Sequence, residues 1–134
     1  MICLHPPCNN YTKRQYCSSI CRGKHQSWII VQAWKNGNDI GYKKGYRLKR
    51  AVRLYILEKY NHKCSKCGWN EINSASGTSP IEVDHIDGNC SNCKEENLIV
   101  LCPNCHALTP TYKALNKGNG IRNRHEYSKL VDHS

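Results

Sequence analysis

The sequence predicts a small α+β fold that depends on bound zinc, and three observations lead to this prediction. The chain of 134 residues has no Phe, one Met and 39% hydrophobic residues, so its apolar core is thin. Ten cysteines are present, and most of them occur in two groups of four. Two short strand-like segments enclose a polar loop and precede a helical turn. We therefore expect a ββα unit clamped by zinc, preceded by an amphipathic helix and a further zinc-binding segment.

Residues 1–27 are predicted to form the N-terminal zinc-binding segment. Its stretch "YCSSICRGKH" is typical of a zinc knuckle that runs into a basic helix, as in small treble-clef zinc fingers. The expected ligands are its four cysteines, Cys3, Cys8, Cys17 and Cys21. His5 and His25 are alternative ligands, because either imidazole could replace one of the thiolates.

Two further segments follow this finger. Residues 28–45 are predicted to form a basic connector, since "KNGNDIGYKKG" combines glycine and asparagine as loops do. Residues 46–61 are predicted to form an amphipathic helix, with apolar side chains at helical spacing. That apolar stripe consists of Leu48, Ala51, Val52, Tyr55 and Ile56. The candidate DNA contacts are basic residues of the connector and the helix, namely Lys43, Lys44, Arg47, Arg50 and Arg53.

Positive charge is concentrated in the first half of the chain. The formal net charge is +10, and residues 1–61 contain twelve Lys and Arg but only two acids, Asp39 and Glu58. Residues 62–134 contain eight basic and eight acidic residues. A basic half beside a neutral half is typical of a nucleic-acid-binding segment attached to a metal-dependent domain. The simpler alternative is a solvated face with surplus lysines.

The cysteines are interpreted as metal ligands, and the protein as intracellular. The N-terminus "MICLHPPCNNYTKRQ" lacks an apolar run of signal-peptide length, and no stretch approaches membrane-spanning length. Close cysteine pairs in a reducing compartment bind metals more often than they form disulfides. We therefore expect no membrane partner.

A second zinc site is predicted from two Cys-x-x-Cys turns that lie 34 residues apart. Each turn can offer two thiolates from one side, and together they complete a tetrahedral shell. The ligands are Cys64, Cys67, Cys102 and Cys105. Gly68 suits the tight turn after the first pair. Cys90 and Cys93 have no second pair, so we interpret them as loop thiols unless another ligand joins them.

Catalytic groups are predicted between these turns. The segments "IEVDHI" (81–86) and "NLIVL" (97–101) are strand-like and are joined by a polar loop. Asp84 and His85 would then end the first strand, facing His106 at the start of the helical segment. A carboxylate and an imidazole can share a divalent cation, and a second imidazole can take a proton from water. These are the minimal requirements for phosphodiester hydrolysis.

Each of these residues also has a simpler interpretation. Asp84 could be an ordinary strand-end residue, Asn97 could close the loop, and His106 could replace a cysteine in the zinc shell. After a short turn at 103–108, Thr109 and Pro110 are predicted to start a new helix at "PTYKALN".

The stretch "VDHIDGN…ENLIVLCPNCHALT" resembles the HNH endonucleases, of the zinc-containing type common in bacteriophages. The motifs "KCSKCGW" and "TPTY" follow the same pattern, so the resemblance covers about residues 46–117. It implies a ββα-metal core within a nuclease domain at 46–134, and a phage protein in the host cytoplasm. It departs from the family at Cys93, which follows Asn92 where paired asparagines are usual.

The resemblance also implies a role for each candidate. His85 is the general base, Asn97 holds the loop, and Asp84 and His106 hold a catalytic Mg²⁺ or Mn²⁺. The leading hypothesis is thus a metal-dependent endonuclease that cuts double-stranded DNA, with homing, restriction-like and packaging roles all open. The alternative is a zinc-stabilised DNA-binding protein without cleavage activity. A packaging protein with a decayed nuclease core is a third hypothesis, which the intact set of four residues disfavours.

Overall fold

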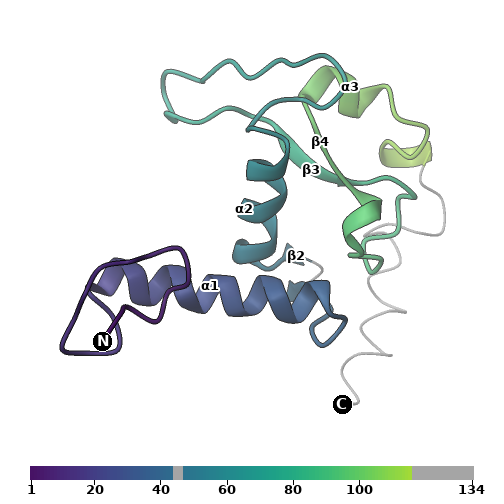
Figure 1. The fold of residues 1–134 in the computed structure, drawn as a ribbon. Coiled ribbons are helices and arrows are strands. Elements are labelled where there is room, and N and C mark those ends of the chain that lie inside the picture. The colour runs from purple at the N-terminus through teal and green to yellow at the C-terminus, as the bar shows by residue number, and fades with distance from the viewer. Residues whose placement is uncertain (44–46, 116–134) are drawn as a thin grey trace. The chain divides into compact units, whose positions relative to one another are not determined.

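The computed structural model describes residues 1–43 and 47–115, which fall into two compact units divided between Gly41 and Tyr42 (Figure 1). The first unit contains one helix, α1 (Ser19–Lys35). The second contains β1 (Tyr42–Lys43), β2 (Arg47–Leu48), α2 (Arg50–Lys59), β3 (Glu82–His85), η1 (Glu95–Asn97), β4 (Leu98–Leu101), α3 (Pro103–Ala107) and η2 (Lys113–Leu115). Two short antiparallel sheets, β1–β2 and β3–β4, confirm the predicted α+β class. Within the described ranges, no helix combines the length and apolar character needed to cross a membrane.

Helix α1 extends beyond the predicted end of the finger at residue 27. It begins after Ser18, whose hydroxyl oxygen accepts the N–H of Cys21 at 3.1 Å. No Gly or Pro occurs between Lys24 and Lys35, so nothing interrupts the helix before Asn36. Residues 28–35 of the predicted connector are therefore helical, and the glycine- and asparagine-rich loop follows them.

The first unit has a small apolar core around Val31 and Trp34 of α1, which are both buried. Gly41 has a φ of +83° and lies against Trp34, where an added Cβ would come within 2.6 Å of the indole. Only glycine fits this close approach. So few buried side chains leave the unit dependent on another source of stability, as its composition predicted.

Helix α2 is shorter than predicted. Residues 47–48 pair with residues 42–43 as an antiparallel hairpin, and Lys49 has an extended ψ of 140°, so the helix starts at Arg50 instead of residue 46. Val52 and Ile56 of the predicted apolar stripe are buried, and its other members, Leu48, Ala51 and Tyr55, are half-buried. Leu57, which the stripe did not include, is buried as well.

The core of the second unit lies between α2 and the β3–β4 hairpin. The hairpin register runs from Glu82 opposite Leu101 to His85 opposite Leu98, which confirms the two predicted strands. Val52 and Ile56 are fully buried, as is Val100, and Leu98 and Leu101 are almost so. The loop between the strands is also tied to α2, since Glu95 accepts a hydrogen bond from Tyr55 at 3.0 Å and pairs with Lys59 at 3.1 Å.

The short helical turn predicted after the second strand is confirmed as α3, which Pro103 opens. The prediction of a new helix from Pro110 is wrong in the part that the structure describes. The Thr109 hydroxyl donates to the carbonyl of His106 at 2.8 Å, so it closes α3 and does not cap a new helix. Residues 110–112 form a turn and a bend, and Lys113, the first residue of η2, has a φ of +47°, so no α-helix runs through this segment. Residue 116 lies outside the described ranges.

Candidate metal sites and active site

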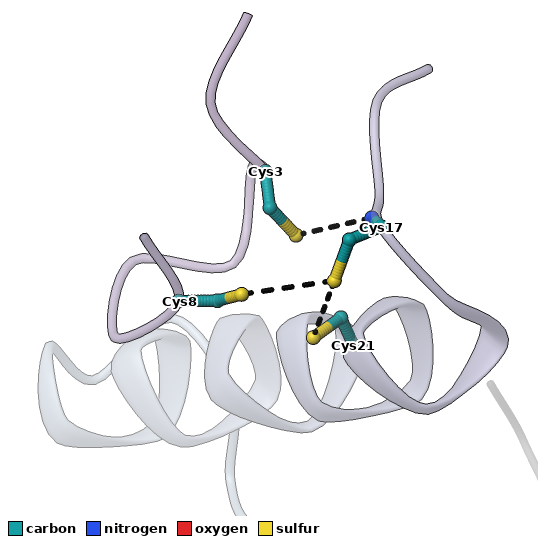
Figure 2. Close-up of side chains that lie close together, drawn as sticks. All are labelled: Cys3, Cys8, Cys17 and Cys21. Atoms are coloured by element: carbon teal, nitrogen blue, oxygen red, sulfur yellow. Dashed lines mark hydrogen bonds between the residues drawn. The ribbon is translucent and has the colours of Figure 1, made fainter. Parts of the chain in front are cut away.

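The N-terminal cysteines form a compact group (Figure 2). The sulfur of Cys17 lies 3.7 Å from that of Cys8 and 3.4 Å from that of Cys21, and the backbone N–H of Cys17 donates to the sulfur of Cys3 at 3.5 Å. All four sulfurs lie within 4.8 Å of one another. The N-terminal loop supplies Cys3 and Cys8, and the first turn of α1 supplies Cys21, because its N-cap fixes the register.

Without a bound cation, the neighbouring thiols shift one another's pKa values. The hydrogen bond with Cys21 lowers the pKa of Cys17 to about 7, while the same contact raises the pKa of Cys21 to about 12. Four crowded thiols cannot all ionise unless a central cation replaces the protons. The two histidines considered as alternative ligands are not part of the group. His25 contacts the Tyr16 hydroxyl at 2.7 Å, and His5 is buried.

The second group joins two distant Cys-x-x-Cys turns, whose four sulfurs also lie within 4.8 Å of one another. Cys64 and Cys67 follow α2, Cys102 follows β4 as the N-cap of α3, and Cys105 lies in α3. The sulfurs of Cys67 and Cys102 are 3.6 Å apart. Gly68 has a φ of +77°, and its N–H donates to the Cys64 carbonyl, which confirms the predicted tight turn.

In the second group as well, hydrogen bonds lower the pKa of one cysteine and raise that of another. Burial disfavours the Cys64 thiolate, but backbone N–H donors outweigh it and lower the pKa of Cys64 to about 6. The neighbouring thiol of Cys102 raises the pKa of Cys105 to about 12. All ten cysteines remain thiols. Both predicted four-cysteine groups are therefore present, in an arrangement compatible with zinc.

Asp84 and His106 face each other across the hairpin and α3. The Nε2 atom of His106 lies 3.6 Å from Oδ1 of Asp84, which is longer than a hydrogen bond. Burial raises the pKa of the Asp84 carboxyl above its usual range, and the nearby His106 opposes that rise. Consecutive helical residues point about 100° apart, so α3 can direct Cys105 to the sulfur group and His106 to β3. This donor pair fits a hard divalent cation.

Glu82 is a site residue that sequence reasoning missed. Its Oε2 atom lies 3.6 Å from Nδ1 of His106, on the opposite ring nitrogen from Asp84. Side chains two apart in a strand share a face, so Glu82 and Asp84 both point toward α3. The alternation in "EVDH" puts Glu82 on the same face as Asp84, but this identifies Glu82 as a site residue only when the helix that faces the strand is known.

His85 leaves the strand on the other face and contacts the loop. Its Nε2 atom lies 3.5 Å from the sulfur of Cys93, which is buried. Burial lowers the pKa of His85 below its ordinary value, and the carboxylates of Asp84 and Asp87 partly oppose the shift. The imidazole is therefore neutral at neutral pH and able to accept a proton. The structure thus pairs Asp84 with His106 and places His85 against the loop.

Asn97 lies at the centre of the loop's hydrogen bonds and is itself buried. Its Oδ1 atom accepts the N–H of Asp87 at 3.1 Å, and its Nδ2 atom donates to Asp87 Oδ1 at 2.9 Å and to the Asn92 carbonyl at 2.8 Å. Asn92 adds a bond from its own amide to Asp87 Oδ2 at 2.7 Å. These contacts fix the path of the chain directly after His85.

Asn97→Ala is expected to destabilise the second unit by about 1–3 kcal/mol, because it leaves buried polar groups of the loop unpaired. Asn92→Ala removes one exposed side-chain bond and serves as the graded control, with an expected loss of about 1 kcal/mol or less. Urea unfolding of the zinc-loaded protein measures both changes. Equal losses in the two variants would contradict the central position of Asn97.

The candidate DNA contacts that the structure describes are solvent-exposed. Lys43 and Arg47 are cross-strand partners in the β1–β2 hairpin, and Arg50 and Arg53 lie on the outer side of α2. Lys44 lies outside the described residues. All four described side chains can therefore reach a phosphate without rearrangement of the core.

The first unit also contains a basic groove. It has a volume of about 910 Å³ and runs along the segment that leads into α1. Its basic lining residues are Lys13, Arg14 and Arg22, and no acidic residue lines it. Asp39 is the one acid in the sequence of residues 1–41, so little opposes the positive potential of this unit.

These features define a cysteine-rich protein with two four-cysteine groups that could each hold a metal ion, and with a separate candidate cation site of carboxylate and imidazole groups. Over 83 residues, 62% of its length, the chain is 41% identical to the H-N-H endonuclease F-TflIV of Escherichia phage T5. Over 66 residues, 49% of its length, it is 30% identical to the Zorya protein ZorE of Escherichia coli. It spans 34% of the first relative and 17% of the second. No family model and no solved structure matches the chain.

The resemblance to HNH endonucleases that the motifs indicated is confirmed by this similarity to a phage protein of that name. The similarity covers most of the chain but about a third of the relative.

Proposed function

We propose that the chain is a metal-dependent DNA endonuclease with an HNH-type ββα-metal core formed by β3, β4 and α3. The observation that carries the proposal is the pairing of Asp84 with His106, within a chain that is 41% identical to a named H-N-H endonuclease. A carboxylate and an imidazole opposed in this way suit a cation that also takes water and phosphate oxygens as ligands.

The proposed chemistry is hydrolysis of a phosphodiester bond. Asp84 and His106 would hold Mg²⁺ or Mn²⁺, which when bound stabilises charge on the phosphate and on the departing 3′ oxygen. His85 would take a proton from the attacking water. Because its Nε2 atom faces the sulfur of Cys93, Nδ1 is the nitrogen left to accept that proton. The expected products carry 5′-phosphate and 3′-hydroxyl ends.

We further propose that residues 46–134 form the nuclease domain and that residues 1–27 contain the cysteines of a treble-clef-like finger. The helix of this finger continues to Lys35, so the connector proper begins after that residue. Zinc is the metal that four tetrahedral thiolates favour, so we assign one zinc ion to each four-cysteine group. We also propose an intracellular location, because close groups of cysteines act as metal ligands instead of forming disulfides in a reducing compartment.

The basic groove of the first unit is proposed to contact the phosphate backbone of double-stranded DNA. Zinc held by four thiolates is an anionic centre, and Cys17 lines the same groove. Lys13, Arg14 and Arg22 offset this charge and leave positive potential for phosphate.

The triple variant Lys13→Gln, Arg14→Gln, Arg22→Gln is expected to flatten the dependence of DNA affinity on salt. Three lost phosphate contacts lower the slope of log K against log salt by about 2.7. The matched control removes the same charge at exposed sites outside the groove, with Lys24→Gln, Lys63→Gln and Lys66→Gln. Fluorescence anisotropy across a salt series gives both slopes, and similar slopes in the two variants would rule out the groove.

The proposed activity is tested by incubating zinc-loaded protein with supercoiled plasmid and Mg²⁺ or Mn²⁺. We expect nicked or linear products with 5′-phosphate ends, and none when the cation is withheld. Tight DNA binding without cleavage under any divalent cation would contradict the proposal and favour a zinc-stabilised DNA-binding protein.

A further inference from the structure

We infer that Glu82 is a positioning residue that holds the imidazole of His106 in the orientation needed for cation binding. This inference rests on the proposed function, because it concerns the same cation site. It starts from an asymmetry in the contacts of His106: Nδ1 faces the Glu82 carboxylate and Nε2 faces the Asp84 carboxylate, both at 3.6 Å.

The two carboxylates differ in exposure, and this difference separates their roles. The Asp84 side chain is 18% exposed, whereas that of Glu82 is 64% exposed. A carboxylate shielded from water and opposite Nε2 is suited to hold a cation with that nitrogen. A carboxylate in solvent on the far side of the ring is suited to accept a hydrogen bond from Nδ1–H.

The chemistry of metal-bound histidine gives this arrangement its function. A histidine that ligates through one nitrogen usually donates the N–H of the other to a carboxylate, which fixes both the tautomer and the ring orientation. At 3.6 Å neither contact is a hydrogen bond, so we infer that a small rotation of the ring brings Nδ1–H onto Glu82, which leaves the lone pair of Nε2 directed to Asp84. The ring of Tyr112 limits rotation further, since it meets the imidazole edge-on with centroids 5.3 Å apart.

The backbone keeps this arrangement in register. Glu82 and Asp84 occupy alternate positions of β3, opposite Leu101 and Ile99 of β4, so the two carboxylates rise from one face of a short, paired strand. Helix α3 follows β4 after a single residue and brings His106 over that face. A one-residue shift of the register would move both acids away from the imidazole.

The test uses the full-length, zinc-loaded protein without DNA. Mn²⁺ binding is measured by electron paramagnetic resonance for wild type, Glu82→Gln and Glu82→Ala. We expect Mn²⁺ affinity to fall by about 10–100-fold in Glu82→Ala. The fall should be smaller in Glu82→Gln, whose amide oxygen can still accept a hydrogen bond from Nδ1–H. The matched control, Glu71→Gln, removes an exposed carboxylate elsewhere in the unit and is expected to bind Mn²⁺ as wild type does.

A second readout reports on the imidazole itself. Nitrogen-15 NMR of His106 in the protein free of Mn²⁺ should give the tautomer protonated at Nδ1 in wild type, and a mixture of tautomers in Glu82→Ala. Unchanged affinity and an unchanged tautomer in Glu82→Ala would overturn the inference. Equal loss of Mn²⁺ binding in Glu82→Gln and Asp84→Asn would overturn it as well, because Glu82 would then be a direct ligand.

These outcomes separate the inference from the function on which it rests. If wild type cuts plasmid DNA and the Glu82 variants keep their affinity and tautomer, the inference alone fails. If wild type neither binds Mn²⁺ nor cuts, both fail. Cleavage by Glu82→Gln that recovers at saturating Mn²⁺ is the expected result for a residue that acts through His106.

Discussion

His85→Ala is expected to lower the rate of DNA cleavage by about 10²–10⁴-fold while leaving DNA affinity and folding close to those of wild type. The side chain is partly buried at the end of β3, and its contact with Cys93 holds the ring against the loop. Its removal takes away the group proposed to accept the proton of water but none of the proposed cation ligands. Single-turnover plasmid cleavage and anisotropy binding measure the two effects separately.

A pH profile gives an independent check of the same role. Burial lowers the pKa of His85 below its ordinary value, so the neutral, proton-accepting form persists somewhat below pH 6.5. Wild-type cleavage should therefore be constant near neutral pH and fall only on the acid side of that value, and the residual rate of His85→Ala should lack this fall. His62→Asn serves as the control, since it removes an exposed imidazole at a φ of +53°, which Asn tolerates. Wild-type activity in His85→Ala would exclude the general-base role.

Cys105→Ala and His106→Ala are expected to act on different properties, although the two residues are adjacent in α3. Structural zinc contributes about 10–16 kcal/mol of apparent binding free energy, which is comparable to the whole stability of a domain. Loss of one thiolate should therefore unfold much of the second unit and release its zinc. His106 lies outside the sulfur group, so its replacement should change stability by about 1 kcal/mol or less and abolish cleavage.

Circular dichroism, zinc content by elemental analysis and plasmid cleavage distinguish these outcomes. Asn104→Ala, at an exposed position of the same helix, is the control and should be unaffected in all three measurements. Unfolding in both Cys105→Ala and His106→Ala would contradict the division of the two residues between structure and chemistry. If Cys105→Ala kept its zinc and its fold, the prediction that all four thiolates are required would be wrong.

Local patterns predicted the parts of this fold that local physics determines. Period-two alternation located both strands of the hairpin, and Cys-x-x-Cys spacing identified the sulfur groups, because each signal lies within a few residues. The start of α2 was predicted too early because Arg47 and Leu48 pair with β1, a tertiary preference that overrides helical spacing. The helix expected after Thr109 failed for a similar reason, since that hydroxyl bonds backward to His106.

The sequence predicted which residues belong to the candidate site, but it could not predict which of them lie in contact. The sequence pattern identifies Asp84, His85, Asn97 and His106 without fixing how they are arranged, and their catalytic roles stay predictions. Glu82 was missed because its partner lies 24 residues away and only the docking of α3 on β4 brings them together. The contact between His85 and Cys93 was missed for a comparable reason, since a loop thiol gives no sequence signal of which ring it will touch.

The loop between β3 and β4 has a consequence for how substrate would be received. Asn97 and Asp87 bond the loop internally, and Glu95 anchors its end to α2, so its conformation is set when the second unit folds. A segment already held in one conformation loses little entropy when a ligand arrives. Association should then resemble rigid docking at this edge of the hairpin, with rate constants governed by encounter and charge instead of by a slow ordering step.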